Sequence, residues 1–239
     1  MSKVTTITFF KFDQFKSKLW AFGMMQYAHS PLQKVTGQTF YKLMGSGKGK
    51  GFNPLPDWSV YSLIQVWESI EASESFFSES ELIAKYQNKT SKLCTIYMNN
   101  ISSKGLWSGQ NPFLDENSQM INTEQLAVIT RASIRPSRLW KFWSYVPTSR
   151  KSLDDNPGLI YTKGIGEVPL LQMATFSIWK DKSSLMEFAY KQQHHKKAIE
   201  LTKKYDWYSE ELFARFQIIK IEGKPIWSSI ETKEPEEIN

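Results

Sequence analysis

Two adjacent histidines, His194 and His195, are the side chains in this chain best suited to metal or acid–base chemistry. They lie in the stretch YKQQHHKKAIE at residues 190–200, whose pattern is typical of a helix. Residues three and four positions apart share one face of a helix. His194 therefore falls on a mostly polar face with Glu187, Lys191 and Ala198. His195 falls on the face that carries Leu185, Phe188, Gln192, Ile199 and Thr202.

A histidine on an apolar face has two interpretations. Burying the ring of His195 costs free energy unless a hydrogen-bond partner or a metal ion compensates for it. A structural hydrogen bond would meet this need. So would a haem iron, which requires only one protein ligand and suits an apolar cavity lined by residues such as Phe188 and Ile199. The sequence has no HExxH motif and no Cys/His cluster that would indicate another metal site.

Two arginines in expected strands are candidates to assist such a centre. Arg131 lies in QLAVITRASIRP and Arg215 in EELFARFQIIKI, each near the middle of its strand. An inward-facing arginine could pair with a haem propionate or polarise an iron-bound oxygen species, whereas an outward-facing one would be an ordinary surface residue. Gln172 is a weaker polar candidate on a neighbouring strand. The single cysteine, Cys94, lies in the apolar run KLCTIYM, which indicates a buried and unreactive thiol.

The elements that would position these residues occur twice along the chain. Four landmarks recur in the same order: KLWAF as RLWKF, GSG as GIG, QVWES as SIWKD, and GLWSG as PIWSS. The offset is 120 residues from Trp107 to Trp227 but 112 from Trp67 to Trp179, as an insertion in the GKGKGFNPLP loop of the first copy would give. With the local offset of 112, His195 corresponds to Ile83, so the first copy carries an apolar residue at this position.

Each copy has the element order β-α-β-β-α-β. In the first copy VTTITFFKF predicts a strand, DQFKSKLWAFGMMQYA a helix that begins near Asp13 as its N-cap, and EASESFFSESELIAKY a second helix. This is the order of a ferredoxin-like repeat, and two repeats can pack sheet against sheet as a dimeric α+β barrel. We therefore expect an α+β fold with an N-terminal repeat at residues 1–108 that holds no cofactor, a linker at 109–123, a C-terminal repeat at 124–229 that carries the haem site, and a disordered tail at 230–239.

Composition narrows the range of functions. The net charge is +6, but the basic residues are scattered and form no nucleic-acid-binding signature. The chain begins without a signal-peptide pattern and has no apolar run long enough for a transmembrane helix, so we expect a cytoplasmic protein. Its charge is compatible with a peripheral contact with the inner face of the membrane. The sequence is also compatible with formation of a homo-oligomer. The aromatic share of 14% would suit either a large apolar cavity or a bulky core.

Several longer stretches resemble one enzyme family. LMGSGKGKGFNPLPDWSVYSLIQVWES, ITRASIRPSRLWKFW, GIGEVPLLQMATFSIW and WYSEELFARF together are similar to spheroidene monooxygenase and its relatives, from about Phe9 to Trp227. The resemblance implies a haem b enzyme that uses dioxygen and a reduced ferredoxin-type donor to oxygenate the end of an acyclic carotenoid. The family pattern has a histidine in the helix before WYSEELFARF, which falls on His195, while the neighbouring position, often proline in relatives, is His194 here.

The leading interpretation is thus a haem monooxygenase for a long apolar substrate. His195 would be the iron ligand, Phe188, Ile199 and Gln172 would line the cofactor, and Arg131 and Arg215 would be its catalytic partners. One alternative is a haem enzyme of the same barrel type with peroxidase, chlorite dismutase or aldoxime dehydratase chemistry. Another is a cofactor-free barrel that binds a ligand, in which His195 is only structural.

Overall fold

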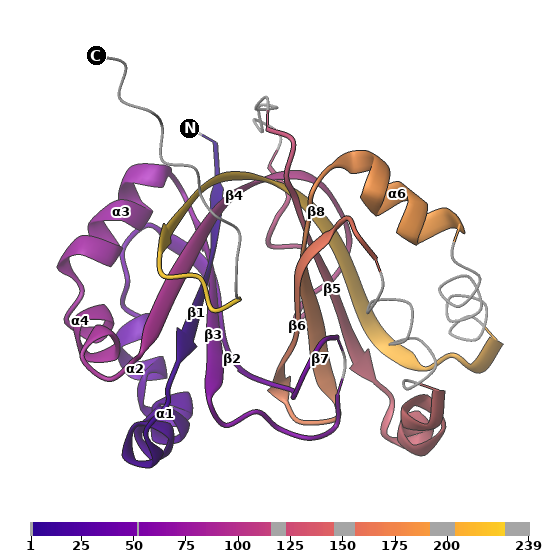
Figure 1. Cartoon of the computed structure of the whole chain (residues 1–239), viewed down its shortest axis with the longest axis horizontal. Coiled ribbons are helices and arrows are strands. Elements are labelled where there is room, and N and C mark those ends of the chain that lie inside the picture. Colours follow the sequence, from indigo (N-terminus) through magenta and orange to yellow (C-terminus); the bar gives the residue numbers. More distant parts are fainter. Residues whose placement is uncertain (1, 52, 116–122, 146–155, 192–203, 228–239) are drawn as a thin grey trace.

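Eight antiparallel strands close into one barrel, with helices against its outer surface (Figure 1). The computed structural model describes residues 2–51, 53–115, 123–145, 156–191 and 204–227. The strand order around the barrel is β1-β3-β2-β6-β7-β5-β8-β4, so each half of the chain contributes four adjacent strands. The expected pair of ferredoxin-like repeats in one α+β barrel is confirmed.

The first repeat contains β1 (Val4–Lys11), α1 (Phe15–Tyr27), α2 (His29–Leu32), β2 (Gln38–Ser46), β3 (Val60–Trp67), α3 (Ile70–Glu79), α4 (Glu81–Gln87) and β4 (Lys92–Gly105). The second contains β5 (Leu126–Ile134), a 3-10 turn (Pro136–Arg138) that leads into helical residues 139–145, β6 (Leu159–Val168), β7 (Gln172–Trp179), α6 (Lys182–Lys191) and β8 (Tyr208–Gly223). The tail at 230–239 lies outside the described residues.

The helix ends differ from the sequence predictions in two places. Asp13 does not cap α1: the N-cap is Gln14, and its side chain makes no capping hydrogen bond. The helix predicted over EASESFFSESELIAKY is divided at Ser80, whose backbone is extended and whose hydroxyl accepts a hydrogen bond from the N–H of Ile83. A serine that caps a new helix in this way ends the preceding one.

The interior of the barrel is filled by side chains from both repeats. Phe9 of the first repeat packs on Phe176 of the second, with ring centroids 5.5 Å apart. Trp107 packs on Phe40 near the start of β2, and Trp227 packs on Tyr161 near the start of β6. Because β2 and β6 are antiparallel neighbours, the two repeat-related tryptophans close opposite ends of the barrel.

The strand pairings show which residues of the two repeats are equivalent. In the first repeat Leu63 of β3 lies between Thr8 of β1 and Leu43 of β2. In the second, Thr175 of β7 lies between Thr130 of β5 and Gly164 of β6. The ladder between β4 and β8 has the same symmetry about the pair Asn99 and Gln217. The repeats are thus related by an approximate two-fold axis, which makes a residue-by-residue comparison of their surfaces meaningful.

Substitution of Gly105 by alanine should destabilise the barrel at the end of β4. Gly105 has a φ of +96°, and an added Cβ would lie 2.1 Å from the carbonyl oxygen of Glu211 on β8. We expect the Gly105→Ala variant to lose about 2 kcal/mol or more of unfolding free energy, measured by urea denaturation. Gly45→Ala is the matched control, because a Cβ added at Gly45 would have nothing within 4 Å of it. Equal stability of the two variants would contradict the close approach of β8 to β4.

Candidate functional site

The outer face of the N-terminal sheet is covered by a continuous apolar layer. Phe10, Leu43 and Leu63 project from three adjacent strands, and each is almost completely buried. They pack with side chains of α1, α3 and α4, including Ile83. This face is therefore an ordinary sheet–helix core with no space for a large ligand at its centre.

Among the described residues, the outer face of the C-terminal sheet lacks this layer at its centre. The equivalents of Phe10, Leu43 and Leu63 are Ala132, Gly164 and Thr175, as the pairings of β5, β6 and β7 show. The apolar residues form two smaller groups instead: one includes Trp179 and Leu185, and the other includes Phe142 and Trp207. Replacing three bulky core side chains by small ones costs several kcal/mol unless another group fills the volume. The centre of this face is our candidate site.

Arg215 and Phe213 of β8 border this face. Their equivalents in the first repeat are Tyr97 and Thr95, which are both buried. Phe213, in contrast, is 37% exposed, and Arg215 is half-buried with its guanidinium 5.2 Å from the Phe213 ring. The Nε of Arg215 is buried and has no hydrogen-bond partner among the described residues. A buried, unpaired guanidinium N–H is costly, so this atom is suited to an anionic or oxygen-bearing ligand.

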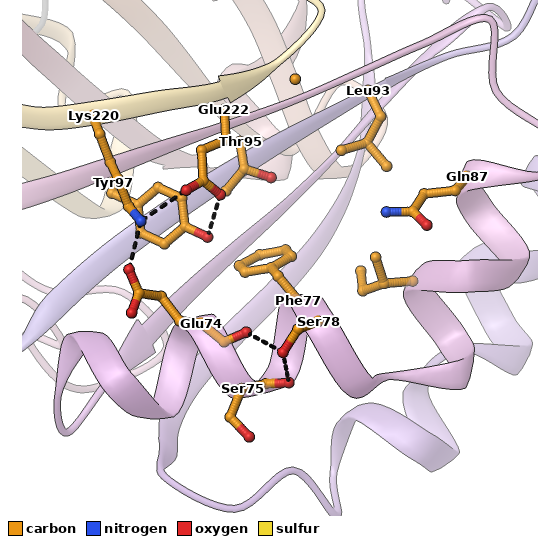
Figure 2. A pocket seen from close by; sticks show the side chains of 12 residues that line it. Glu74, Ser75, Phe77, Ser78, Gln87, Leu93, Thr95, Tyr97, Lys220 and Glu222 are labelled. Atoms are coloured by element: carbon orange, nitrogen blue, oxygen red, sulfur yellow. Dashed lines mark hydrogen bonds and ion pairs between the residues drawn. The ribbon is translucent and has the colours of Figure 1, made fainter.

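The corresponding groove of the first repeat has no such unsatisfied cation among the residues that line it (Figure 2). This groove of about 500 Å³ lies between α3, α4 and the strands β4 and β8. Lys220 forms ion pairs with Glu74 at 2.5 Å and Glu222 at 2.7 Å, and its ammonium lies 4.5 Å from the Tyr97 ring centroid. The Tyr97 hydroxyl donates to Glu222 at 3.0 Å. Burial and this hydrogen bond raise the pKa of Tyr97.

Arg131 lies on the opposite face of the sheet from Arg215. It projects into the barrel interior, where its side chain is 2% exposed, forms an ion pair with Glu210 and lies 5.8 Å from the Trp107 ring centroid. Glu210 also accepts hydrogen bonds from the backbone N–H groups of Ser108 (3.0 Å) and Gly109 (2.7 Å), so the pair holds the connection between the repeats against the barrel. The two arginines therefore cannot both line one cofactor.

The other predicted site residues are only partly brought together. Phe188 of α6 packs on Trp179 beside the candidate site, with ring centroids 5.0 Å apart. Gln172 begins β7 opposite Ser133, on the same side of the sheet as Arg131 and away from the candidate site. His194, His195 and Ile199 lie outside the described residues. Cys94 is buried in the barrel interior, where burial raises the pKa of its thiol to about 12.

The reduced side-chain volume at Ala132, Gly164 and Thr175 was not predicted. The signal was present in the repeat, because Phe10, Leu43 and Leu63 are all larger than their equivalents. Reading it requires the register of each strand pair. The register of the strand pairs shifts at three places: between Tyr97 and Met98, between Asn100 and Ser102, and within β6. Each shift changes by one or two residues which position of the first repeat corresponds to which position of the second.

Comparison with known proteins identifies the family. No family model matches the chain. It is 32% identical over 221 residues to the spheroidene monooxygenase of Rhodobacter capsulatus, covering 92% of each chain. It is 32% identical over 223 residues to that of Cereibacter sphaeroides, covering 93% of this chain and 68% of the relative. This chain belongs to the spheroidene monooxygenase family. The resemblance found in the sequence is thus confirmed, and the chain is an oxidoreductase of the monooxygenase type.

The solved structures agree with this fold. A structure of aldoxime dehydratase in complex with butyraldoxime aligns with a TM-score of 0.59 at 10% identity, covering 91% of this chain and 79% of that protein. This chain therefore shares its barrel architecture with an aldoxime dehydratase, and the fold alone does not select a reaction. Within the described part of the chain, no helix has the length and apolar character needed to cross a membrane.

The Arg131–Glu210 pair should make stability depend on pH. Burial alone would raise the pKa of Glu210, but hydrogen bonds from Gly109 and Ser108 and the charge of Arg131 outweigh it, so the pKa lies below the ordinary 4.5. Its stabilising contribution is complete above that value and is lost as the pH falls through the lowered pKa. The Glu210→Gln substitution should lower the unfolding free energy by about 2 kcal/mol or more at pH 7, measured by urea denaturation. The difference in unfolding free energy between this variant and the wild type should become smaller below about pH 4.5.

Glu211→Gln is the matched control, since this neighbouring side chain is exposed on β8. It should leave the unfolding free energy nearly unchanged at both pH values. A Glu210→Gln variant with wild-type stability at pH 7 would show that the ion pair does not stabilise the fold.

Proposed function

We propose that the chain is a haem b-dependent monooxygenase that oxygenates a long apolar polyene, with the cofactor on the outer face of the C-terminal sheet. The observation that carries this proposal is the replacement of Phe10, Leu43 and Leu63 by Ala132, Gly164 and Thr175 on that face. A planar apolar group between sheet and helix would occupy the volume that these side chains fill in the first repeat.

The repeat supports His195 as the residue that faces this volume. α3 and α6 are equivalent: the ring pair Trp67–Phe76 (5.2 Å) corresponds to Trp179–Phe188 (5.0 Å). Each helix also begins with a side chain that accepts a backbone hydrogen bond, Ser69 in one and Asp181 in the other. Continuing the same spacing brings His195 to the position of Ile83. In the first repeat that residue is buried and belongs to the same apolar cluster as Leu63.

The residues of the described face are suited to such a cofactor. The unpaired Nε of Arg215 would donate a hydrogen bond to a carboxylate of the cofactor, which would explain why a cation lies at the edge of an apolar site. Phe188 and Phe213 would supply apolar contacts to the cofactor. When bound, haem would supply a redox-active iron that reacts with dioxygen after reduction. Arg131 would not contact the cofactor. It would hold β5 and β8 in position through its ion pair with Glu210.

The overall reaction would insert one oxygen atom of O₂ into a C–H bond and release the other as water, using two electrons from a reduced ferredoxin-type donor and two protons. We propose an acyclic carotenoid as the substrate, because the relatives carry the name spheroidene monooxygenase. Phe213, which is exposed at the edge of this face, would contact a slender apolar chain beside the cofactor.

The His195→Ala variant tests the cofactor directly. The purified wild-type protein, supplied with haem, should show a Soret band that shifts on reduction with carbon monoxide. His195→Ala should abolish or strongly shift this band, because the iron would lose its protein ligand. His194→Ala is the matched control and should leave the spectrum unchanged. A wild-type protein that remains colourless with added haem would end the proposal, and the same loss in His194→Ala alone would transfer the ligand role to His194.

Replacement of Arg215 tests which arginine serves the site. Arg215→Gln should weaken haem binding about tenfold or more, because a charge-assisted hydrogen bond to the cofactor would be lost. Arg215→Lys should recover part of the affinity, and Arg138→Gln, which changes an exposed arginine of the same repeat, should have no effect. Turnover of an acyclic carotenoid, butyraldoxime and hydrogen peroxide should be compared in parallel. Selective turnover of peroxide or aldoxime would favour the alternative haem chemistries.

A further inference from the structure

The helix α1 presents several large apolar side chains to solvent, in addition to those that it packs on the core. Phe15, Leu19 and Phe22 lie on one helical face and are 75%, 56% and 55% exposed. The side of α1 that packs on the sheet carries the buried Ser17 and Ala21, and Trp20 of the same helix packs on Tyr86 in the core. The helix is therefore apolar on two sides, whereas an ordinary surface helix is apolar only on the side that faces the core.

The loop between β2 and β3 extends this apolar surface. Trp58 packs on Phe22 with ring centroids 5.2 Å apart, yet it is still 51% exposed, and Leu55 is 60% exposed. We call these five residues, Phe15, Leu19, Phe22, Leu55 and Trp58, the α1 patch. Single exposed apolar residues are common, but large aromatic and aliphatic residues gathered from two elements mark an interaction surface.

The segments that form the α1 patch carry more positive than negative charge. The exposed Asp13 precedes Phe15, but it lies 3.9 Å from Lys11. Residues 14–56 contain no aspartate or glutamate, and their lysines include Lys16, Lys18, Lys48 and Lys50. Lys16, Lys48 and Lys50 are exposed. Asp57 follows the loop, but it is engaged by Lys163 at 2.7 Å, which with Ser59 lowers the pKa of Asp57 despite its burial. The surroundings of the patch therefore carry an excess of positive charge.

Figure 1 places α1 and the β2–β3 loop together at the lower edge of the molecule, away from the N-terminus. The helical residues 139–145 of the second repeat lie at the same edge on the other side (Figure 1), where Trp140 is 90% exposed. Trp140 belongs to RLWKF, the repeat of KLWAF in α1. Each repeat thus places a segment that contains exposed apolar residues at this edge.

We propose that the α1 patch inserts into the surface of an anionic lipid bilayer. A helix with exposed Phe and Leu side chains flanked by lysines can bury its apolar face among acyl chains while the ammonium groups contact anionic headgroups. A second copy of the chain is a poorer occupant, because a two-fold contact would bring the same lysines together. A protein partner is also less suitable, since lysine is depleted at protein interfaces. This inference rests on exposed residues and charge, not on the proposed haem chemistry.

Vesicle sedimentation of the full chain tests the proposal. The wild-type protein should sediment with vesicles of equimolar phosphatidylcholine and phosphatidylglycerol and much less with phosphatidylcholine alone. Phe15→Ser, Leu19→Ser and Phe22→Ser combined should reduce binding to the anionic vesicles by about tenfold or more, because three apolar side chains no longer enter the bilayer. Lys48→Gln with Lys50→Gln should reduce it about fivefold per lysine.

The matched control is Leu106→Ser with Leu114→Ser, which removes two exposed leucines near the connection between the repeats. It should bind like wild type. Equal thermal midpoints and, if haem binds, equal Soret bands would show that every variant is folded. Absence of wild-type binding to anionic vesicles would overturn the proposal, as would binding that the triple serine variant retains. Loss of a dimer in that variant without any vesicle binding would instead identify the patch as a contact between copies.

Discussion

Closure of the barrel is the constraint on which the rest of the structure depends. Each half-sheet has two faces, and the inner faces of the two repeats are committed to packing against one another. Phe9 on Phe176, Trp107 on Phe40 and Trp227 on Tyr161 are parts of this shared interior. A large cofactor cannot enter such an interior without displacing the core that joins the repeats. Any spacious site must therefore lie between a half-sheet and its own helices.

The outer faces of the two half-sheets carry different side chains. In the first repeat Phe10, Leu43 and Leu63 fill it, and the groove beside it is occupied by the ion pairs of Lys220. In the second repeat the equivalent positions are small, and a guanidinium N–H at Arg215 has no partner among the described residues. The first repeat thus has a conventional core on this face, while the described residues of the second have smaller side chains and a guanidinium N–H without a partner, the features on which our proposed site rests.

The sequence predicted the architecture well because the signals for it are local and repeated. Alternating strands and the landmarks around Trp67, Trp107, Trp179 and Trp227 were sufficient for the two-repeat barrel, and longer motifs were sufficient for the family. The face on which each arginine lies was not predictable. Side chains alternate across a strand, so a shift of one residue in register moves Arg131 from one face to the other. The helix break at Ser80 also depended on a single hydroxyl.

The long strands β4 and β8 join the two halves of the barrel, and their ladder is symmetric about Asn99 and Gln217. Such a seam is what a dimer of identical ancestral subunits would possess. Because both copies lie in one polypeptide, a substitution in one copy does not appear in the other. Two identical subunits could therefore not carry Phe10, Leu43 and Leu63 on one outer face and Ala132, Gly164 and Thr175 on the other, whereas a single chain with two repeats can.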